Sequence, residues 1–478
     1  MKRVAVVLAA GKGTRMRSER PKVLHPLLGK PMLGYVLEAL GAVRWDGVFV
    51  VVGHRREWVE AAFAGAASFV VQDPPLGTGD AVKIALKRAG APPETLVVLN
   101  GDAPLLRAET IRRLVEAHEA ASAAATVAAA RLDDPTGYGR LVRDDDGRLV
   151  GIVEEKDATP AVRAIREVNA GLYAFFGPAL AEALSALRPD NAQQEYYLTD
   201  AVGHLLARGA AVEVFPLSDP TEARGVNDRR ELAEAEAILR RRIIERHLLA
   251  GVTVEDPAST WIGPDVEIAA DAIIRAGSRL MGRTRVGEGA EVGPYADLTD
   301  TEVGAGARVR YTVAEGAAIG AGSDVGPYAH LRPGTRLGRA VRVGNFVEVK
   351  NSTVGDGTKL PHLTYVGDAT VGSGVNVGCG TITVNYDGVA KHRTVIEDGA
   401  FIGCNTNLIA PVRVGAGAYV AAGSTITDDV PDGALAIARA RQANKPGYAE
   451  RLRAKFRDRS GRSAGEAVSH HGGEGNEG

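Results

Sequence analysis

The sequence predicts an α/β protein with two parts, a doubly wound α/β domain at the N-terminus and a parallel β-helix at the C-terminus. Three patterns support this fold class. Short apolar runs alternate with helical patterns early in the 478 residues, as in doubly wound domains. An aliphatic residue then recurs at every sixth position over much of 262–426. A run of strong helix formers separates the two regions.

In the N-terminal part, the alternation of strands and helices predicts where a ligand lies. Buried parallel strands are continuous apolar runs, which occur here at residues 4–8, 48–52, 96–99 and 126–129. Helical patterns cover residues 31–40, 79–89 and 108–120. In open α/β sheets, ligands bind at the carboxyl ends of the strands. The loop after the first strand is therefore the first candidate site.

This loop, residues 9–16, combines small residues with basic ones. Its glycines would let backbone N–H groups approach phosphate oxygens, and Lys12, Arg15 and Lys22 would add positive charge. The loop is not a Walker A motif, and it lacks the third glycine of the dinucleotide fingerprint. We interpret it as an anion cradle; the alternative for so short a motif is an ordinary solvated turn.

A second polar group follows the predicted strand at 96–99, where Asp102 comes shortly after Asn100. A carboxylate at the end of a strand commonly holds a hard cation beside a nucleotide phosphate. Asp102 is therefore a candidate magnesium ligand. The alternative is a helix cap or a loop aspartate.

The region between the two parts predicts one long helix, residues 228–249, that spans roughly 30 Å. Its polar surface suits a strut between two domains. The basic run at 240–242 is expected to be a solvated, ion-paired face of this helix rather than a nucleic-acid patch.

The six-residue period matches neither a helix nor an alternating strand, and it is typical of a β-helix whose aliphatic side chains point into the core. It runs through 262–298, 319–349 and 396–426. Glycine follows many of the aliphatic residues, and we expect it to supply the positive φ of a corner. A polar stretch at 383–392 interrupts the repeat. In repeat proteins such interruptions map to loops, which frequently carry function.

Polar residues gather near the irregular steps, where a plain repeat would have small or apolar ones. They are Arg332, Lys350, His362, Tyr365, Asn376, Asn385 and Tyr386. Basic side chains suit a sugar phosphate, and a histidine suits removal of a proton from an amine near neutral pH. For His362 alone, the alternative is an exposed corner residue. The histidines are spaced too irregularly for the close metal-binding pair of a hexapeptide-repeat carbonic anhydrase.

Composition narrows the choice of partners. The net charge of −2, the pI near 6.6 and the low aromatic content argue against nucleic acid. The sequence has no secretory signal and no apolar run long enough to cross a bilayer, so we expect a cytoplasmic protein with no integral membrane segment and with reduced Cys379 and Cys404. The tail, residues 446–478, is expected to be largely disordered.

A series of motifs resembles one family along most of the chain. In the N-terminal part these motifs lie at 8–16, 21–24, 76–79, 100–102, 137–140, 154–157, 169–171, 195–200 and 225–227, and in the β-helix at 328–332, 344–350, 360–365 and 385–388. Together they resemble the bifunctional bacterial N-acetylglucosamine-1-phosphate uridyltransferase / glucosamine-1-phosphate acetyltransferase family. The resemblance covers residues 4 to about 445.

The resemblance implies two reactions. Acetyl-CoA would acetylate the 2-amine of glucosamine 1-phosphate at the β-helix. UTP would then transfer UMP to N-acetylglucosamine 1-phosphate at the N-terminal domain, with Mg²⁺ as cofactor and release of pyrophosphate. The UDP-N-acetylglucosamine formed would supply synthesis of peptidoglycan and of lipopolysaccharide-type envelope polymers. The alternative is a single-activity nucleotidyltransferase whose β-helix only assembles or regulates it.

The resemblance also implies roles for residues of the N-terminal domain. UTP would contact Leu8, Ala9, Ala10, Gly11, Lys22, Gln72, Gly77 and Thr78. N-Acetylglucosamine phosphate would contact Asn100, Gly139, Glu154, Asn169 and Asn227. Asp102 and Asn227 would hold Mg²⁺, while Arg15 and Lys22 would stabilise charge on the phosphates. Pro75, Asp80 and Asn100 depart from residues that many members of the family have at these positions.

In the β-helix, the resemblance makes His362 the general base. Glucosamine phosphate would contact Arg332, Lys350, Tyr365 and Asn376, and Asn385 would help to orient it. Acetyl-CoA would contact Cys379, Asn385, Tyr386, Cys404, Ala422 and Arg439. Cys404 replaces the usual serine, exchanging a good hydroxyl donor for a weak thiol donor.

The family's organisation divides this chain into four parts. They are a uridylyltransferase domain of the nucleotidyltransferase type at 1–227, a linker helix at 228–250, a left-handed β-helix acetyltransferase domain at 251–445 and the tail at 446–478. Members of the family are homotrimers that build the acetyl-transfer site between subunits, so we expect a homotrimer that takes small-molecule substrates.

Overall fold

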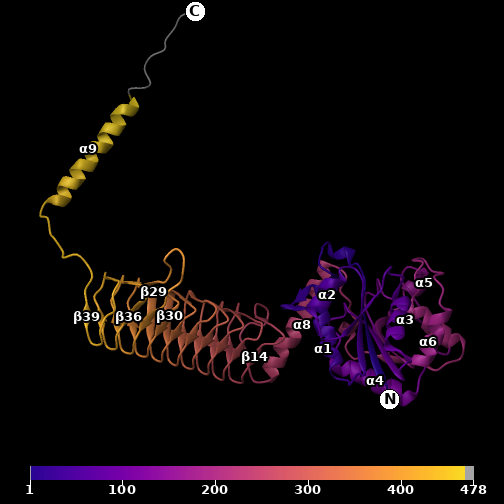
Figure 1. The fold of residues 1–478 in the computed structure, drawn as a ribbon. Helices are drawn as coiled ribbons and strands as arrows, with labels where there is room; N and C mark the ends of the chain where they lie inside the picture. The colour runs from indigo at the N-terminus through magenta and orange to yellow at the C-terminus, as the bar shows by residue number, and fades with distance from the viewer. Residues whose placement is uncertain (1, 469–478) are drawn as a thin grey trace, which may run out of the picture.

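Residues 2–468 are described by the computed structural model, in which an α/β domain and a long β-helix lie end to end (Figure 1). The strands of the α/β domain are β1 (Arg3–Ala9), β2 (Pro26–Leu27), β3 (Lys30–Pro31), β4 (Gly47–Val52), β5 (Ser68–Val71), β6 (Thr95–Asn100), β7 (Ala125–Arg131), β8 (Arg140–Arg143), β9 (Leu149–Val153), β10 (Glu167–Phe175) and β11 (Val212–Pro216). Its helices are α1 (Met32–Leu40), α2 (Arg56–Ala62), α3 (Thr78–Ala89), α4 (Ala108–Ala121), α5 (Pro160–Arg163), α6 (Gly177–Ala186) and α7 (Leu198–Ala207), with 3-10 turns at Thr14–Met16, Lys22–Leu24 and Pro220–Ala223. The predicted strands and helices of this domain form within two residues of their expected ends.

The main sheet of this domain has the order β11-β7-β10-β6-β1-β4-β5. The central strand β1 pairs in parallel with β4 and β6, whereas β10 is antiparallel to both β6 and β7. The sheet is therefore mixed. The sequence did not predict β10, because Asn169 and Gly171 interrupt its apolar pattern, and the pairing of β10 with β7 shifts register between Asn169 and Tyr173.

Helices cover both faces of this sheet. On β1, Val4 and Val6 join the apolar cluster that contains α3, α6 and α7. Ala5 and Val7 join the cluster that contains α1, α2 and α4. Because successive side chains of a strand point to opposite faces, a strand buried on both sides is a continuous apolar run, as observed.

The C-terminal part is a β-helix of short parallel strands that stack coil on coil. One sheet contains β14 (Glu267–Ile268), β17 (Arg285–Val286), β20 (Glu302–Val303), β23 (Ala318–Ile319), β26 (Arg336–Leu337), β28 (Thr353–Val354), β30 (Ala369–Val371), β33 (Thr394–Ile396) and β36 (Val412–Val414). The larger sheet, which covers the other two sides of each coil, contains β12 (Thr253–Val254), β13 (Trp261–Ile262), β15 (Ile273–Ile274), β16 (Arg279–Met281), β18 (Glu291–Val292), β19 (Asp297–Thr299), β21 (Arg308–Val309), β22 (Thr312–Glu315), β24 (Asp324–Val325), β25 (Ala329–Leu331), β27 (Arg342–Lys350), β29 (Lys359–Gly367), β31 (Asn376–Val377), β32 (Ile382–Val384), β34 (Phe401–Ile402), β35 (Asn407–Ile409), β37 (Tyr419–Val420), β38 (Thr425–Ile426) and β39 (Leu435–Ala436).

The six-residue array builds the core of this β-helix. Ile262 pairs in register with Leu280, and Leu280 pairs with Leu298 one coil further along. All three side chains are fully buried. The predicted parallel β-helix is therefore confirmed, and the hexapeptide period is consistent with its left-handed form.

Glycine has a different role in the coils from the one the sequence predicted. The positive φ lies two positions beyond the glycine that follows an aliphatic residue, as at Gly306 and Gly322. The first glycine is required because the next coil is too close. A Cβ atom on Gly320 would lie 2.1 Å from the carbonyl oxygen of Gly338, and one on Gly304 would lie 2.5 Å from the backbone nitrogen of Ala321. Of the glycines that directly follow an aliphatic residue of the array, Gly293 and Gly326 do have a positive φ.

We expect Gly320→Ala to lower the free energy of unfolding of the β-helix by about 1–3 kcal/mol, because a backbone oxygen cannot move away from the added methyl without shifting a coil. Urea unfolding followed by circular dichroism measures this change. Gly322→Ala is the matched control, since its Cβ would meet no atom within 4 Å and only its φ of +67° is unfavourable. It should cost about 1 kcal/mol. Equal stabilities for Gly320→Ala and the wild type would contradict the steric explanation.

Helix α8 (Arg229–Leu249) joins the two parts, and its N-terminus is capped by Asp228, whose side chain accepts a hydrogen bond from the Glu231 N–H at 2.9 Å. Its buried apolar residues, including Leu239 and Ile243, belong to one apolar cluster that continues from the α/β domain into the first coils. The linker helix is therefore packed against apolar side chains of both the α/β domain and the β-helix.

One residue of the basic run contradicts the prediction of a solvated face. Arg242 is largely buried and donates to the carbonyl oxygen of Leu105 at 2.7 Å, to Asp219 at 2.9 Å and to the Thr221 hydroxyl at 2.8 Å. Position 242 lies two turns after the buried Ala235, on the same face of the helix. Burial tends to raise the pKa of Asp219, but its hydrogen bonds with Thr221 and Arg242 outweigh this and lower the pKa to about 2. The contact between helix and domain therefore stays ionised at neutral pH.

The C-terminal tail is not largely disordered as predicted, because residues Tyr448–Val468 form helix α9, which extends away from the β-helix (Figure 1). The prediction of disorder rested on the Ser, Gly and His near the end of the tail. The alanine, arginine, lysine and glutamate before them are strong helix formers. Residues 469–478 of the predicted disordered tail lie outside the described residues. Over 2–468, no helix combines the length and apolarity that a membrane span requires.

Candidate active sites

The first cluster joins three residues that are far apart in the sequence. The Lys22 Nζ atom donates to the Asp102 carboxylate and, at 3.2 Å, to Oδ1 of Asn227. The Val226 N–H donates to the Asp102 carbonyl oxygen at 2.9 Å, and the Asn227 N–H donates to Glu231 in the first turn of α8 at 2.7 Å. The linker helix therefore begins at this cluster and fixes one of its members.

This cluster has the donor set that a magnesium ion prefers. Asp102 and Asn227 both direct a side-chain oxygen to one point, where Lys22 now lies. Magnesium is commonly held by one or two protein oxygens, with phosphate and water completing an octahedron. Within the described part of the chain, no group of three or more His, Cys, Asp or Glu could hold a metal ion alone. The residues therefore fit an ion that binds together with a nucleotide.

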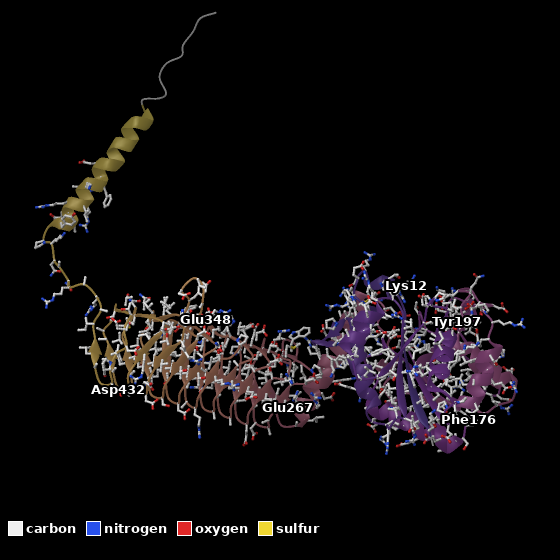
Figure 2. The ribbon with its side chains drawn as sticks, in the orientation of Figure 1. Lys12, Phe176, Tyr197, Glu267, Glu348 and Asp432 are labelled. Carbon is white, nitrogen blue, oxygen red and sulfur yellow. The ribbon has the colours of Figure 1, made fainter. Side chains whose placement is uncertain are left out.

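The loop after β1 lies next to this cluster and is open. A Cβ atom on Gly11 would meet nothing within 4 Å, and Lys12 and Arg15 are exposed. Gly13 has a φ of +59°, and its Cβ would lie 2.7 Å from Cβ of Lys22. Figure 2 shows Lys12 at the upper end of the domain and Phe176 at the opposite end. The loop therefore has room for an anion within reach of basic side chains.

Gln72, Gly77 and Thr78 come together at the N-terminus of α3. Gln72 is 4% exposed, and its Nε2 donates to the Gly77 carbonyl oxygen and to Oδ2 of Asp80, both at 2.9 Å. The Thr78 hydroxyl accepts from the Leu198 N–H at 3.0 Å. Gly77 has a φ of +110°, and a Cβ atom there would lie 2.6 Å from the Tyr196 carbonyl oxygen. These contacts fix the loop on which a base would rest.

The predicted sugar residues also gather, around the irregular stretch of β10. The Asn169 N–H donates to the Gly139 carbonyl oxygen at 2.9 Å. A Cβ on Gly139 would lie 3.4 Å from the carboxylate oxygens of Glu154, and one on Gly171 would lie 2.4 Å from Nδ2 of Asn100. Asn100, Gly139, Glu154 and Asn169 therefore line one region.

Sequence reasoning missed two neighbours of this region. The Thr199 hydroxyl donates to Glu154 at 3.1 Å, and the Asn169 amide donates to the Tyr173 hydroxyl at 2.5 Å. Burial raises the pKa of Glu154, which the hydrogen bond from Thr199 opposes. Thr199 lies within the 195–200 motif, so the motif indicated it without assigning it a role.

The second cluster lies on the β-helix, on the side of the coils that follows the His362 corner. Arg332 donates to Glu348 at 2.8 Å, and Glu348 is the register partner of Tyr365. The Asn385 amide donates to Asp368 at 2.6 Å and to the Tyr365 hydroxyl at 3.4 Å. Figure 2 shows Glu348 on the β-helix, away from the Lys12 end of the α/β domain. The two clusters are separate sites.

Lys350 belongs to this cluster together with a residue that sequence reasoning missed, Lys391. Lys350 is close enough to lower the pKa of Lys391, first through a side-chain hydrogen bond and then through charge repulsion, while Asp368 opposes this. Two neighbouring ammonium groups attract a phosphate. Lys391 lies in the polar stretch at 383–392, so its position in the interruption was the available signal.

His362 is exposed at a corner of its coil and is oriented by the coil before it. Its Nδ1 lies 2.8 Å from Oδ1 of Asn345. An amide oxygen only accepts hydrogen bonds, so Nδ1 carries a hydrogen, and in the neutral imidazole Nε2 is then the nitrogen with the lone pair. His362 therefore presents a proton acceptor to solvent.

Four of the residues predicted to contact acetyl-CoA lie at this same corner, in the coils that come after the coil of His362. The Gly380 N–H donates to the Leu363 carbonyl oxygen at 2.9 Å, the Asn405 N–H to that of Cys379 at 2.7 Å and the Gly423 N–H to that of Cys404 at 2.8 Å. His362, Cys379, Cys404 and Ala422 thus occupy equivalent places in consecutive coils, with Arg439 next in order. Asn385 and Tyr386 lie instead in the polar interruption.

Asn376 is not brought to the other sugar-phosphate residues within one chain. It pairs in register with Lys359 and Phe401, on the side of the coil before the His362 corner. Tyr365 pairs with Glu348 and Ile382, on the side after that corner. Within one chain, Asn376 and Tyr365 therefore lie on different sides of the β-helix.

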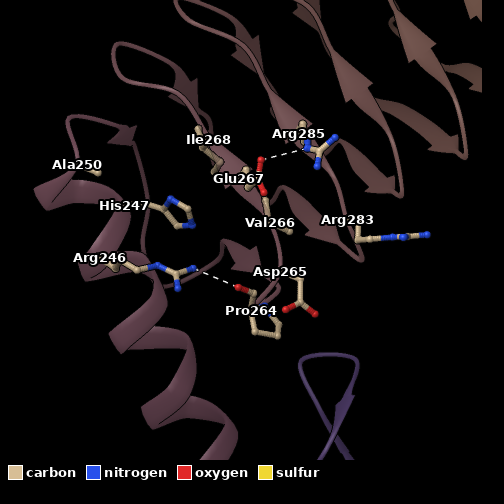
Figure 3. Close-up of a pocket in the computed structure, with 10 residues that line it drawn as sticks. All are labelled: Arg246, His247, Ala250, Pro264, Asp265, Val266, Glu267, Ile268, Arg283 and Arg285. Atoms are coloured by element: carbon tan, nitrogen blue, oxygen red, sulfur yellow. Dashed lines mark hydrogen bonds and ion pairs between the residues drawn. The ribbon is translucent and has the colours of Figure 1, made fainter. Parts of the chain in front are cut away.

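A groove of about 650 Å³ lies elsewhere, where α8 meets the first coils (Figure 3). Two of its arginines are engaged within the groove, because Arg285 pairs with Glu267 at 3.1 Å and Arg246 donates to the Pro264 carbonyl oxygen at 3.3 Å. Burial and then Arg246 lower the pKa of His247 to about 4, so it is neutral at physiological pH. None of the predicted site residues lies in this groove.

The fold and the two clusters define a two-domain transferase, with a nucleotide site at the strand ends of an α/β domain and a second site on a hexapeptide β-helix. Residues 5–201 match the MobA-like NTP transferase domain, and residues 393–428 match the bacterial transferase hexapeptide (six repeats). The bifunctional protein GlmU of Brevibacillus brevis is 51% identical over 456 residues, which are 95% of this chain and 99% of the relative. Bifunctional GlmU proteins of Exiguobacterium sp. (51%, covering 94% of this chain and 100% of the relative) and Streptomyces avermitilis (50%, covering 94% of each) are similar. The chain belongs to the family of bifunctional GlmU proteins.

Proposed function

We propose that this chain makes UDP-N-acetylglucosamine in two steps at its two sites, acetyl transfer on the β-helix followed by uridylyl transfer in the α/β domain. The observation that carries the proposal is the convergence of two separate polar clusters, each with the chemistry of one step. Lys22, Asp102 and Asn227 suit a nucleotide triphosphate, and Lys350, Lys391 and His362 suit an amino sugar phosphate.

In uridylyl transfer, a phosphate oxygen of N-acetylglucosamine 1-phosphate attacks the α-phosphorus of UTP, and pyrophosphate leaves. Asp102 and Asn227 would hold Mg²⁺, which supplies charge neutralisation for the leaving phosphates. Lys22, released from its contact with Asp102, and Arg15 would face the phosphate oxygens. Glu154 and Asn169 position the sugar. Such reactions depend on positioning and electrostatics rather than on a covalent catalyst.

In acetyl transfer, the 2-amine of glucosamine 1-phosphate attacks the thioester carbonyl carbon of acetyl-CoA, and the C–S bond breaks. His362 Nε2 takes the proton that the amine loses, and the CoA thiolate leaves and is then protonated. Arg332, Lys350 and Lys391 bind the sugar phosphate. The corner that carries Cys379 and Cys404 is available for CoA. UTP and acetyl-CoA are cytoplasmic metabolites, which supports a cytoplasmic location for the enzyme.

The test is a coupled assay on the purified full chain with glucosamine 1-phosphate, acetyl-CoA, UTP and Mg²⁺. Both free CoA thiol and pyrophosphate should appear. Omitting UTP should stop only pyrophosphate release. A chain that released pyrophosphate from N-acetylglucosamine 1-phosphate but no CoA from glucosamine 1-phosphate would be a single-activity nucleotidyltransferase, contrary to the proposal.

The proposal includes a homotrimer, supported by an exposed apolar corner of the β-helix. Tyr295, Tyr311, Tyr328 and Phe346 occupy this corner in successive coils, with ring centroids 5.5, 5.6 and 5.5 Å apart. All four are exposed. Exposed apolar ladders of this kind mark association surfaces. Leu363 continues the ladder to the His362 corner, so a neighbouring chain seated here would also reach the acetyl-transfer site.

We expect Tyr328→Glu to dissociate the trimer, because it places a charge in the centre of the apolar ladder. Light scattering after gel filtration should show a monomer. Acetyl transfer should fall by at least about tenfold, since Asn376 of a neighbouring chain is lost, while uridylyl transfer is retained. Phe176→Glu, at an exposed apolar residue of the α/β domain, is the matched control and should remain trimeric. A Tyr328→Glu trimer with full acetyl transfer would remove the support for this surface.

A further inference from the structure

We propose that Asp80 sets the base specificity of the nucleotide site, by fixing the orientation of the Gln72 side-chain amide. This inference rests on the proposed function in one respect, namely that Gln72 contacts the base of UTP. Asp80 would act through Gln72 and is therefore a positioning residue rather than a catalytic one.

The surroundings of Gln72 determine which way its amide points. The Gly77 carbonyl oxygen and Oδ2 of Asp80 both lie 2.9 Å from Nε2, and both groups only accept hydrogen bonds. The opposite orientation would place the amide oxygen against two other oxygens. Gln72 is 4% exposed, so water could not relieve that repulsion. The amide nitrogen therefore faces the protein, and both of its hydrogens are used.

This orientation leaves Gln72 with only an acceptor for a ligand. The hydrogen bonds of the Gln72 side chain among the described residues are both made by Nε2, and none is made by Oε1. A uracil presents an N3–H donor that such an oxygen accepts. A cytosine presents an unprotonated N3 at the same place, and that lone pair would face the oxygen unpaired. A buried polar group that is matched by one base and left unpaired by the other discriminates strongly between them.

Of the two acceptors that hold the Gln72 amide, only that of Asp80 can be removed by substitution, because Gly77 supplies a backbone oxygen. Without the Asp80 acceptor, Gly77 would still hold one hydrogen of the amide. The opposite orientation would then place Oε1 against one oxygen rather than two, so the Gln72 amide could turn over and donate to a cytosine N3. Asp80 lies in the first turn of α3, so its charge also favours the helix N-terminus. The test must separate that charge from the hydrogen bond.

The experiment compares kcat/KM for UTP and for CTP by pyrophosphate release, with N-acetylglucosamine 1-phosphate and Mg²⁺, in the full-length wild type, Asp80→Leu and Asp80→Asn. Leucine is close to aspartate in shape and has no acceptor, whereas asparagine loses the charge and keeps an acceptor oxygen. We expect the ratio of UTP to CTP to fall at least tenfold in Asp80→Leu and less than threefold in Asp80→Asn. CoA release from the acetyl-transfer site should be unchanged in both variants, which shows that they fold.

Three outcomes would overturn the inference. The first is an unchanged ratio in Asp80→Leu, and the second is a proportional loss with both nucleotides, which is what a merely structural role produces. The third is an equal fall in the ratio in both variants, which would assign the effect to charge. In each of these cases the wild type still releases pyrophosphate from UTP. A wild type that releases none would instead overturn the proposed uridylyl transfer, and this inference with it.

Discussion

Asp102→Ala should abolish UDP-sugar formation and leave acetyl transfer intact. Among the described residues, the substitution removes the one carboxylate that meets Lys22, and it leaves Asn227 as the only side-chain oxygen directed to that point. With one of two protein ligands gone, Mg²⁺ and the triphosphate lose their fixed position. Removal of such an electrostatic group typically costs about 10²–10³-fold in rate, and we expect at least that loss in pyrophosphate release. CoA release from glucosamine 1-phosphate should match the wild type.

The metal dependence supplies a second measurement on the same variant. Chelation of Mg²⁺ should abolish pyrophosphate release in the wild type and leave CoA release unchanged. Asp102→Asn, which keeps an oxygen without its charge, should require a higher Mg²⁺ concentration for half-maximal rate. Asp145→Ala removes an exposed carboxylate from the turn between β8 and β9 and is the control, with both activities unchanged. Loss of both activities in folded Asp102→Ala would contradict the assignment of separate sites.

The parts of the fold that the sequence predicted are those with a strong period. The six-residue array specified the β-helix because each buried aliphatic residue, such as Leu280, stacks on its counterpart one coil away. The continuous apolar run of β1 likewise specified a strand buried on both faces. Strand β10 has neither signal, since Asn169 and Gly171 interrupt its apolar pattern where the proposed sugar site lies. The polar and small residues that would serve the site are therefore the same residues that hide the strand from a sequence-based prediction.

The residues that were missed act through spatial neighbours rather than through sequence motifs. Lys391 interacts with Lys350 although the two are distant in sequence, and the polar interruption turns back on itself through an antiparallel bridge between Tyr386 and Lys391. Arg242 looked solvated within a basic run, yet the helix turns it toward Asp219. Motifs indicated Lys22, Asp102 and Asn227 as members of one site, and the structure adds their mutual contacts. For Asn376, the register of one chain separates it from Tyr365, which no motif could indicate.

The converse experiment concerns His362, whose replacement by alanine should abolish acetyl transfer and spare uridylyl transfer. Nε2 of His362 is the proton acceptor that the contact between Nδ1 and Asn345 leaves available. A positioned general base typically contributes about 10²–10⁴-fold, so kcat for CoA release should fall within that range. Pyrophosphate release from supplied N-acetylglucosamine 1-phosphate should be unchanged, because the two clusters lie on different domains.

The contact between Asn345 and His362 allows a second prediction, which concerns how the imidazole is oriented. Asn345→Ala keeps the imidazole but no longer fixes which nitrogen carries the hydrogen, so acetyl transfer should fall by a smaller factor, about tenfold. Because His362 is exposed at its corner, added imidazole should partly restore CoA release in His362→Ala and should have no effect on Asn345→Ala. A His362→Ala enzyme that retained the wild-type rate would exclude it as the base. A loss in Asn345→Ala as large as in His362→Ala would mean that the amide itself contacts the substrates, since an orienting group cannot contribute more than the base that it orients.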